Sequence, residues 1–254
     1  MKKLTRLAML PSLAWAMCLS VGTAAADDAA IGLIKQKLGA LQQQMPVESI
    51  QASEQVKGLY EVRLSTGETF FATPNGRYLV VGDLYEVAEQ GVLNLSEQAR
   101  DQARIQAVQA IDPSTQILFS PSAPVKASVY VFTDVDCPYC QKLHQEVPKL
   151  TAAGVEVRYL AFPRTGPQSA TYQKMQQVWC AQDKAQALTQ VKQGQSLETP
   201  PCDSQALPTQ YALGQSVGVR GTPSIVLPDG RMIPGYVQAE QLITALGLSL
   251  ETAN

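Results

Sequence analysis

Two cysteines two residues apart, Cys137 and Cys140, lie where a predicted strand is followed by a predicted helix. The apolar run 129–132 before the pair is typical of a buried strand, and residues 141–146 after it are typical of a helix. This order places the first sulfur at a helix N-terminus, where free N–H groups and the helix dipole favour thiolate over thiol. The second sulfur, one turn further on, is within reach to form a disulfide with the first. The pattern predicts thiol–disulfide exchange; half of a zinc site and a purely structural bridge are the alternatives.

Residues 1–26 have the layout of a secretory signal peptide. A basic start precedes an apolar run over residues 7–22, which Pro11 interrupts, and the alanines at 24–26 provide a small-residue cleavage site. The apolar run is short and no stop-transfer pattern follows it, which argues against a transmembrane helix. Of the five cysteines, Cys18 would be removed with this peptide. The four that remain are an even number, which in an exported protein fits disulfide bonds.

The charge of the chain argues against a nucleic-acid partner. The 254 residues carry 20 Lys and Arg against 22 Asp and Glu. Removing residues 1–26 takes away three basic residues and leaves 17 bases against 22 acids, without a basic stripe that could bind phosphates. The single histidine, His144, argues against histidine-rich metal sites and against histidine-dependent nucleophilic catalysis. It lies four residues after Cys140, so its side chain should point near Cys140 or to solvent; we interpret it as an ordinary helix residue.

Residues 27–92 are predicted to form a small α+β domain. Apolar residues recur at helical spacing within 29–42, and three short strands separated by turns follow. The expected strands are 58–64, 68–73 and 77–87. A domain of this size is marginal alone, which favours pairing with a second copy. Gly82, in the last strand, would either let two backbones approach closely across such a dimer or form a simple bulge.

The segment 93–113 predicts a linker helix. Good helix formers follow an N-cap-like Asn94, and Pro113 ends the run. Few of its residues are apolar, which is typical of a connecting rod rather than of a core helix. It would act as a semi-rigid spacer between two compact regions.

The segment 114–254 predicts an α/β domain with a helical insertion. The strands expected at 129–133 and 155–160 flank the helix that begins at the cysteine pair, and together they make a βαβ unit with a right-handed crossover. A helix-rich stretch, a closing hairpin and a last helix are expected at 169–218, 224–236 and 238–246.

The segment 114–254 resembles the thioredoxin fold, and the chain as a whole resembles the DsbC/DsbG family of periplasmic disulfide isomerases. The motifs that carry the likeness are residues 132–137, 158–164, 179–181, 211–214 and 221–223. The resemblance spans most of the mature chain and is weaker in the first domain. It implies a periplasmic, V-shaped homodimer whose uncharged cleft holds misfolded exported proteins, and reduction by the inner-membrane electron donor DsbD. The cysteine pair itself would be the redox group, with no further cofactor and no metal.

The resemblance also assigns roles around the cysteine pair. Cys137 would attack and Cys140 would resolve. The bond between Thr222 and Pro223 would be cis and lie against the active-site disulfide, leaving the Thr222 backbone free to pair with an extended substrate. Tyr139 is expected to contact substrate with them.

The resemblance implies a structural disulfide between Cys180 and Cys202. Trp179 and the helical surroundings indicate a packed, buried bridge. The four cysteines could instead bind zinc, but gaps of 39 and 21 residues separate Cys140, Cys180 and Cys202, so no second close pair exists.

Two functions stay open within the family. One is a disulfide isomerase of the DsbC type. The other is a DsbG-like chaperone and sulfenic-acid reductase. The residues between the cysteines, Pro138 and Tyr139, are the DsbG-like pair, whereas DsbC usually carries Gly-Tyr there. The presence and spacing of Cys180 and Cys202 resemble the isomerase, and the balance favours it.

Overall fold

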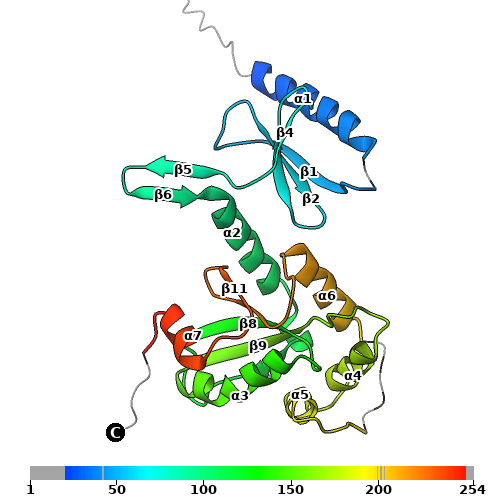
Figure 1. Ribbon diagram of the computed structural model, residues 1–254, viewed down its shortest axis with the longest axis vertical. Coiled ribbons are helices and arrows are strands. Elements are labelled where there is room, and N and C mark those ends of the chain that lie inside the picture. Colours follow the sequence, from blue (N-terminus) through cyan, green and yellow to red (C-terminus); the bar gives the residue numbers. More distant parts are fainter. Residues whose placement is uncertain (1–20, 42, 199, 201, 203, 250–254) are drawn as a thin grey trace, which may run out of the picture. The chain divides into compact units, whose positions relative to one another are not determined.

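The computed structural model describes residues 21–41, 43–198, 200, 202 and 204–249 (Figure 1). Most of the predicted signal peptide, residues 1–20, therefore lies outside the described residues. Within the described part of the chain, no helix is long and apolar enough to cross a membrane. The chain divides into two compact units. The N-terminal unit consists of the chain up to Val62 and of Phe70–Val80. The C-terminal unit consists of Arg63–Thr69 and of the chain from Val81 onward.

The N-terminal region contains a helix, α1 (Val21–Gly39), and a four-stranded sheet of order β1-β2-β3-β4. The strands are β1 (Val47–Ala52), β2 (Tyr60–Leu64), β3 (Thr69–Ala72) and β4 (Leu79–Val80). The apolar positions of α1 pack inward, since Ile34 and Leu38 are buried together with Val62 and Phe71. The Tyr60 hydroxyl donates to Asp27 Oδ1 at 2.7 Å and ties β2 to α1.

The expected strand 77–87 is wrong: it is two strands in different sheets. Strand β4 pairs with β3, whereas β5 (Tyr85–Ala88) forms a separate hairpin with β6 (Gly91–Asn94). Gly82 lies between them with φ +141°, a conformation that side-chain-bearing residues rarely adopt. The chain therefore leaves its extended path at Gly82. Strand β1 was not expected at all.

The helix expected to be a polar rod also contributes to a core. Helix α2 (Leu95–Gln109) begins as expected, with Asn94 Oδ1 accepting from the Glu97 N–H at 2.9 Å. Its last turns are different, because Val108 is fully buried and Arg104 is 4% exposed. Arg104 Nη1 donates to the carbonyl of Gly230 at 2.7 Å. The C-terminal half of α2 is thus part of the core of the C-terminal unit.

The C-terminal unit confirms the expected βαβ core and thioredoxin-like order. Its sheet has the order β11-β10-β8-β9-β7, in which β8 (Ala127–Thr133) and β9 (Val155–Ala161) are parallel and α3 (Pro138–Ala152) connects them. The antiparallel strands are β7 (Ile117–Phe119), β10 (Ser224–Val226) and β11 (Met232–Pro234). The remaining helices are a 3-10 turn (Pro113–Thr115), α4 (Ala170–Trp179), α5 (Lys184–Lys192), α6 (Ala206–Ser216) and α7 (Ala239–Ala245).

Strand β8 is buried on both faces of the sheet. Val129 and Val131 face one cluster, with Leu143 of α3 and Leu242 of α7, because alternate residues of a strand point to opposite sides. Tyr130 and Phe132 face the other cluster, with residues of α2 and α6. Two packed faces hold the carboxyl end of β8 in place, and the cysteine pair follows directly from that end.

Candidate active site

The cysteine pair occupies the first turn of α3. Cys137 is the N-cap residue, in extended conformation, and no side chain caps the helix there. Pro138 is the first helical residue, a position that tolerates proline because its missing N–H has no intrahelical partner. Free backbone N–H groups and the positive end of the helix dipole therefore face the Cys137 sulfur. Both thiols are reduced in the structure.

The two thiols have opposite acidities. The Cys140 thiol, hydrogen-bonded to Cys137, lowers the pKa of Cys137 to about 5 against the opposing effect of burial, and the Thr222 hydroxyl and Arg164 help. Burial raises the pKa of Cys140, and so does its neighbour Cys137. Cys137 is thus a thiolate at neutral pH while Cys140 stays protonated. Each of the two residues is 1% exposed, so acidity and not exposure distinguishes the two thiols.

This difference predicts a pH profile for alkylation of the reduced protein. The pKa of Cys137 is lowered, so its thiolate is present above about pH 5 and is lost as the pH falls through that value. We expect iodoacetamide to modify Cys137 with a half-maximal rate near pH 5, whereas the rate for an unperturbed thiol is half-maximal at about pH 8.5. Mass spectrometry of the modified peptides should find Cys140 unlabelled under the same conditions. Preferential labelling of Cys140 would contradict the assignment.

Thr222 and Pro223 lie against the first cysteine, as the resemblance implies. The Cys137 thiol donates to the Thr222 carbonyl at 3.2 Å, and the Thr222–Pro223 peptide bond is cis. The Thr222 hydroxyl is buried and, within the described residues, has no partner other than the two cysteine sulfurs whose pKa values it lowers. Tyr139 is 58% exposed beside the pair, with Lys142 Nζ 5.5 Å from its ring centroid.

Two residues without an expected role fix the loop before the pair. Asp134 is 1% exposed and accepts from the Asp136 N–H at 2.8 Å and from Arg164 Nε at 3.0 Å. A buried carboxylate needs such partners, and this pairing holds the Arg164 guanidinium where it interacts with both cysteines. Asp136 is bound in turn by Lys174 Nζ at 2.8 Å. The motifs 132–137 and 158–164 were visible in the sequence, but the pairing of Asp134 with Arg164, 30 positions further on, was not.

His144 belongs to a buried hydrogen-bonded chain. Its Nδ1 lies 3.1 Å from the Tyr159 hydroxyl and its Nε2 lies 3.0 Å from the Thr189 hydroxyl. Burial lowers the pKa of His144 to about 4, and the nearby Lys192 adds to this effect. His144 is therefore neutral at physiological pH. Its hydrogen bonds to Tyr159 and Thr189 hold α5 against α3 and β9.

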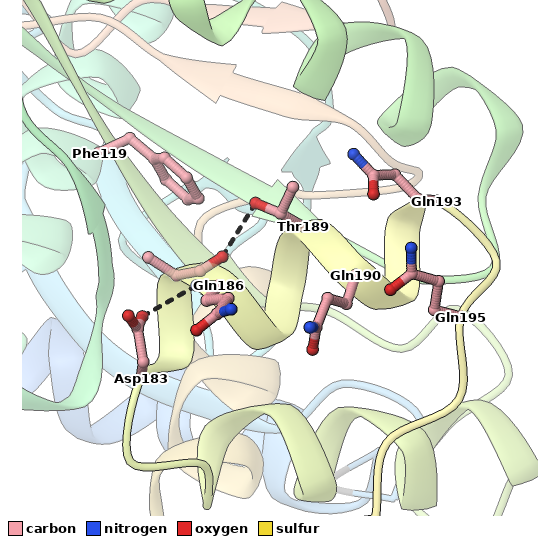
Figure 2. A pocket seen from close by; sticks show the side chains of 8 residues that line it. Phe119, Asp183, Gln186, Thr189, Gln190, Gln193 and Gln195 are labelled. Atoms are coloured by element: carbon pink, nitrogen blue, oxygen red, sulfur yellow. Dashed lines mark hydrogen bonds between the residues drawn. The ribbon is translucent and has the colours of Figure 1, made fainter.

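A pocket of about 450 Å³ lies along α5 (Figure 2). Thr189 lines this pocket together with Phe119, Asp183, Ala185 and four glutamines, Gln186, Gln190, Gln193 and Gln195. None of the residues proposed from the sequence lines it. Half of its lining residues are glutamines. Its one acidic residue, Asp183, caps α5 by accepting from the Gln186 N–H at 2.9 Å.

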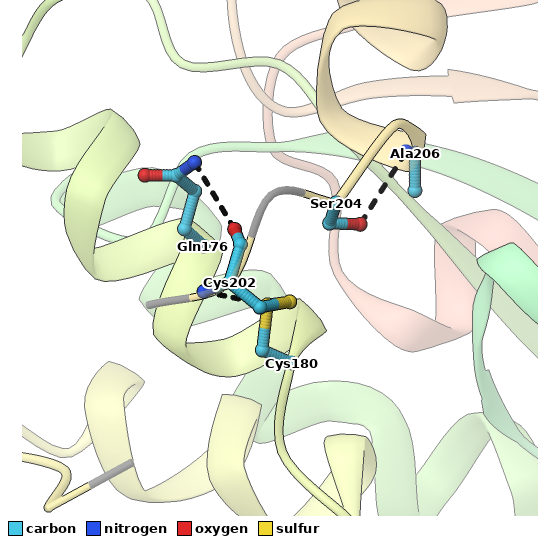
Figure 3. The surroundings of a disulfide bond; sticks show 5 residues. All are labelled: Gln176, Cys180, Cys202, Ser204 and Ala206. Atoms are coloured by element: carbon cyan, nitrogen blue, oxygen red, sulfur yellow. Dashed lines mark hydrogen bonds between the residues drawn. A yellow bond between two sulfur atoms is a disulfide. The ribbon is translucent and has the colours of Figure 1, made fainter. Parts of the chain in front are cut away.

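A disulfide joins Cys180 to Cys202 with a Cα–Cα distance of 5.8 Å (Figure 3). Cys180 caps the C-terminus of α4, and Gln176 Nε2 donates to the Cys202 carbonyl at 3.3 Å. The expected burial is wrong: Cys180 is half-buried and Cys202 is exposed, while the neighbouring Trp179 is the buried residue. With a sequence separation of 22, the chain-entropy model assigns this bridge a stabilisation of about 3 kcal/mol.

The sheet order and a thiol pair of opposite acidity at a helix N-terminus define a thiol:disulfide oxidoreductase of the thioredoxin fold. Comparison with known proteins agrees. Residues 123–248 match the thioredoxin-like domain, and residues 22–97 match the disulfide bond isomerase protein N-terminal domain. The chain belongs to the DsbC family of thiol:disulfide interchange proteins.

Two DsbC proteins support this assignment over most of the chain. Thiol:disulfide interchange protein DsbC of Salmonella typhimurium is 36% identical over 215 residues, 85% of each chain. The protein of the same name from Escherichia coli is 34% identical over 221 residues, 87% of this chain and 88% of its own. A solved disulfide interchange protein from Neisseria gonorrhoeae is 32% identical with a TM-score of 0.48 and covers 54% of this chain and 96% of its own.

Proposed function

We propose that the protein is a disulfide isomerase and reductase that reshuffles wrong disulfides in exported proteins. The observation that carries this proposal is the cysteine pair at the start of α3, in which Cys137 is acidic and Cys140 is not. The Cys137 thiolate attacks one sulfur of a substrate disulfide, and the other substrate sulfur leaves as a thiolate. In isomerisation a second substrate thiolate then displaces Cys137. In reduction Cys140 displaces the substrate and the enzyme is left oxidised.

The surroundings of Cys137 support a role in holding an extended substrate. The Thr222 backbone lies against the attacking sulfur, so a peptide paired with Thr222 would bring its disulfide to Cys137. The exposed ring of Tyr139 offers an apolar contact beside it. The pair must be reduced for isomerisation, so the proposal includes a DsbD-like membrane reductant. It also places the mature protein in the periplasm after removal of residues 1–26.

We propose a homodimer formed through the first domain, residues 27–92. The stretch from Tyr78 to Leu93 exposes eight large hydrophobic side chains, which is unusual for a surface that stays in water. These residues are Tyr78, Leu79, Val80, Val81, Tyr85, Val87, Val92 and Leu93. Gly82 lies within this stretch, and a Cβ there would meet nothing within 4 Å in its own chain. That open space is compatible with close approach of a second backbone.

A DsbG-like chaperone and sulfenic-acid reductase is the second candidate. The observation that favours it is the Pro138–Tyr139 pair between the cysteines. Cys137 would attack the sulfur of a sulfenic acid, releasing water once the leaving hydroxide is protonated, and Cys140 would resolve the resulting mixed disulfide.

Refolding of a scrambled multi-disulfide protein distinguishes the two candidates. We expect the mature protein to accelerate recovery of the native disulfides in a glutathione buffer, because Cys137 is a thiolate at neutral pH. With a Cys137→Ser variant, the substrate should recover its native disulfides no faster than in the buffer alone. Suppression of aggregation without faster recovery, together with reduction of a sulfenic-acid peptide, would instead favour the DsbG-like candidate.

A further inference from the structure

A lysine is buried against the end of β8, the strand that leads to the cysteine pair, and the proposed mechanism does not use it. Lys192, the last residue of α5, is 6% exposed. Its ammonium donates to Thr133 Oγ1 at 2.8 Å and lies 5.6 Å from the centroid of the Tyr159 ring. Lysine is almost never this buried unless it is paired. Within the described part of the chain, no carboxylate forms an ion pair with it.

The groups that favour the charged form of Lys192 are mainly the two active-site cysteines. Burial lowers the pKa of Lys192, while Cys140, Cys137 and Asp134 raise it, in that order of strength. The interaction is reciprocal: of the influences that lower the pKa of Cys140, the charge of Lys192 is the strongest. On Cys137, by contrast, the cation that lowers the pKa is Arg164. Each cation thus interacts with both sulfurs, but Lys192 is the stronger influence on Cys140 and Arg164 the one on Cys137.

Other charged and titratable groups surround this pair. They are Cys137 and His144 of α3, Asp134 after β8, Tyr159 of β9 and Arg164 after β9. His144 is neutral at physiological pH, and burial keeps Tyr159 protonated. When Cys137 is bound in a mixed disulfide, its negative charge is gone. Lys192 and Arg164 are then the cations that interact with Cys140, and Lys192 is the buried one.

We propose that the buried ammonium of Lys192 is the countercharge that lets Cys140 lose its proton and resolve the mixed disulfide. Lys192 is a positioning residue, because it acts through Cys140 and does not touch the substrate. The inference rests on the proposed function, since it requires Cys140 to be the resolving thiol. Thr133, the last residue of β8, holds the ammonium in place.

The resolving step transfers two electrons from the cysteine pair to the substrate. The Cys140 thiol gives its proton to solvent and becomes a thiolate beside the Lys192 ammonium. That thiolate attacks Cys137 Sγ, so the Cys137–Cys140 bond forms and the bond from Cys137 to the substrate sulfur breaks. The substrate sulfur leaves with the electron pair and takes a proton from solvent. The substrate is reduced by two electrons, and the cysteine pair is oxidised by two.

Lys192→Met tests the proposal, because it removes the charge and keeps an unbranched apolar chain. Lys184→Met is the matched control: it lies on the same helix, but its ammonium binds the Ser114 carbonyl at the surface. Both variants react with a disulfide peptide, and acid quenching with mass spectrometry separates mixed-disulfide formation from its resolution. In Lys192→Met, formation should change less than about twofold and resolution should slow about tenfold or more, the effect of one pKa unit or more on Cys140. Lys184→Met should match the wild type.

A pH profile separates this role from a structural one. Loss of the ammonium raises the pKa of Cys140 further, so resolution by Lys192→Met should keep rising with pH after the wild-type rate has levelled off. The same shift should appear in Cys140 alkylation when Lys192→Met is added to Cys137→Ser, a readout that needs no turnover. If Lys192→Met is too unstable to assay, Thr133→Val, which only releases the ammonium, should slow resolution in the same direction.

The outcomes distinguish this inference from the proposed function. Resolution at the wild-type rate in Lys192→Met, or equal slowing of formation and resolution, would overturn the role of Lys192. If the wild-type protein forms no mixed disulfide with the peptide, the proposed function fails first.

Discussion

Replacing Cys140 with serine is expected to turn the enzyme into a covalent trap for its substrates. Cys137 keeps its position at the helix N-terminus and still attacks, but the neighbouring thiol that resolves the mixed disulfide is gone. Replacing Cys137 with serine should instead abolish exchange, because the remaining Cys140 is buried and its pKa is raised. Non-reducing electrophoresis of a periplasmic extract should show ladders of mixed disulfides for Cys140→Ser and none for Cys137→Ser.

The serine at position 140 has a second effect, which sets the control for this experiment. The Cys140 thiol is the strongest influence that lowers the pKa of Cys137, and a hydroxyl at that position can still donate to the thiolate. We therefore expect Cys140→Ala to attack more slowly at low pH than Cys140→Ser, while both trap substrate. Ladders from Cys137→Ser but not from Cys140→Ser would reverse the assignment of the two sulfurs.

The parts of this architecture that follow from short-range patterns were predictable. A continuous apolar strand, a cysteine pair and a helical pattern place Cys137 at the start of α3 without any knowledge of the partners across the sheet. The helical insertion and the closing hairpin also follow from local signals. What failed depended on packing. Strand β1 is mostly exposed at an edge, so it carries little apolar alternation, and the break at Gly82 does not interrupt the apolar pattern around it.

The electrostatics of the site were less accessible from the sequence. Polar and apolar residues are mixed along α5, so the sequence around Lys192 does not indicate which face of this helix is buried. Only the tertiary packing of α5 brings the Lys192 ammonium to Thr133, which lies 59 positions earlier in the chain. The exposed Cys180–Cys202 bridge shows the same limit, because the bulk of Trp179 indicated a buried site while the chain turns outward directly after it.

The largest structural effect should come from separating the first domain from the C-terminal unit. We expect a fragment that begins at Asn94 to fold and one that begins at Gln116 to be unstable, because Val108 and Ile111 are buried in the core of the C-terminal unit. Removing these two side chains would cost about 3–6 kcal/mol of unfolding free energy. The longer fragment also keeps Arg104, which binds the carbonyls of Val217 and Gly230. Urea denaturation should therefore find the fragment 94–254 well folded and 116–254 strongly destabilised.

The fragment 94–254 is expected to be a monomer that keeps thiol exchange and loses most isomerase activity. One catalytic domain can attack a small disulfide peptide, but it cannot retain a large misfolded chain while several bonds are exchanged. Within the full-length protein, Val87→Asp should have the same effect, because it places a charge in the exposed apolar stretch where Val87 is 83% exposed. Val125→Asp, at an exposed valine of the catalytic domain, is the matched control and should leave the dimer intact. Sedimentation velocity measures the oligomeric state, and scrambled-substrate refolding measures the isomerase activity. The prediction fails if the full-length protein is monomeric or if the fragment isomerises as well as the intact chain.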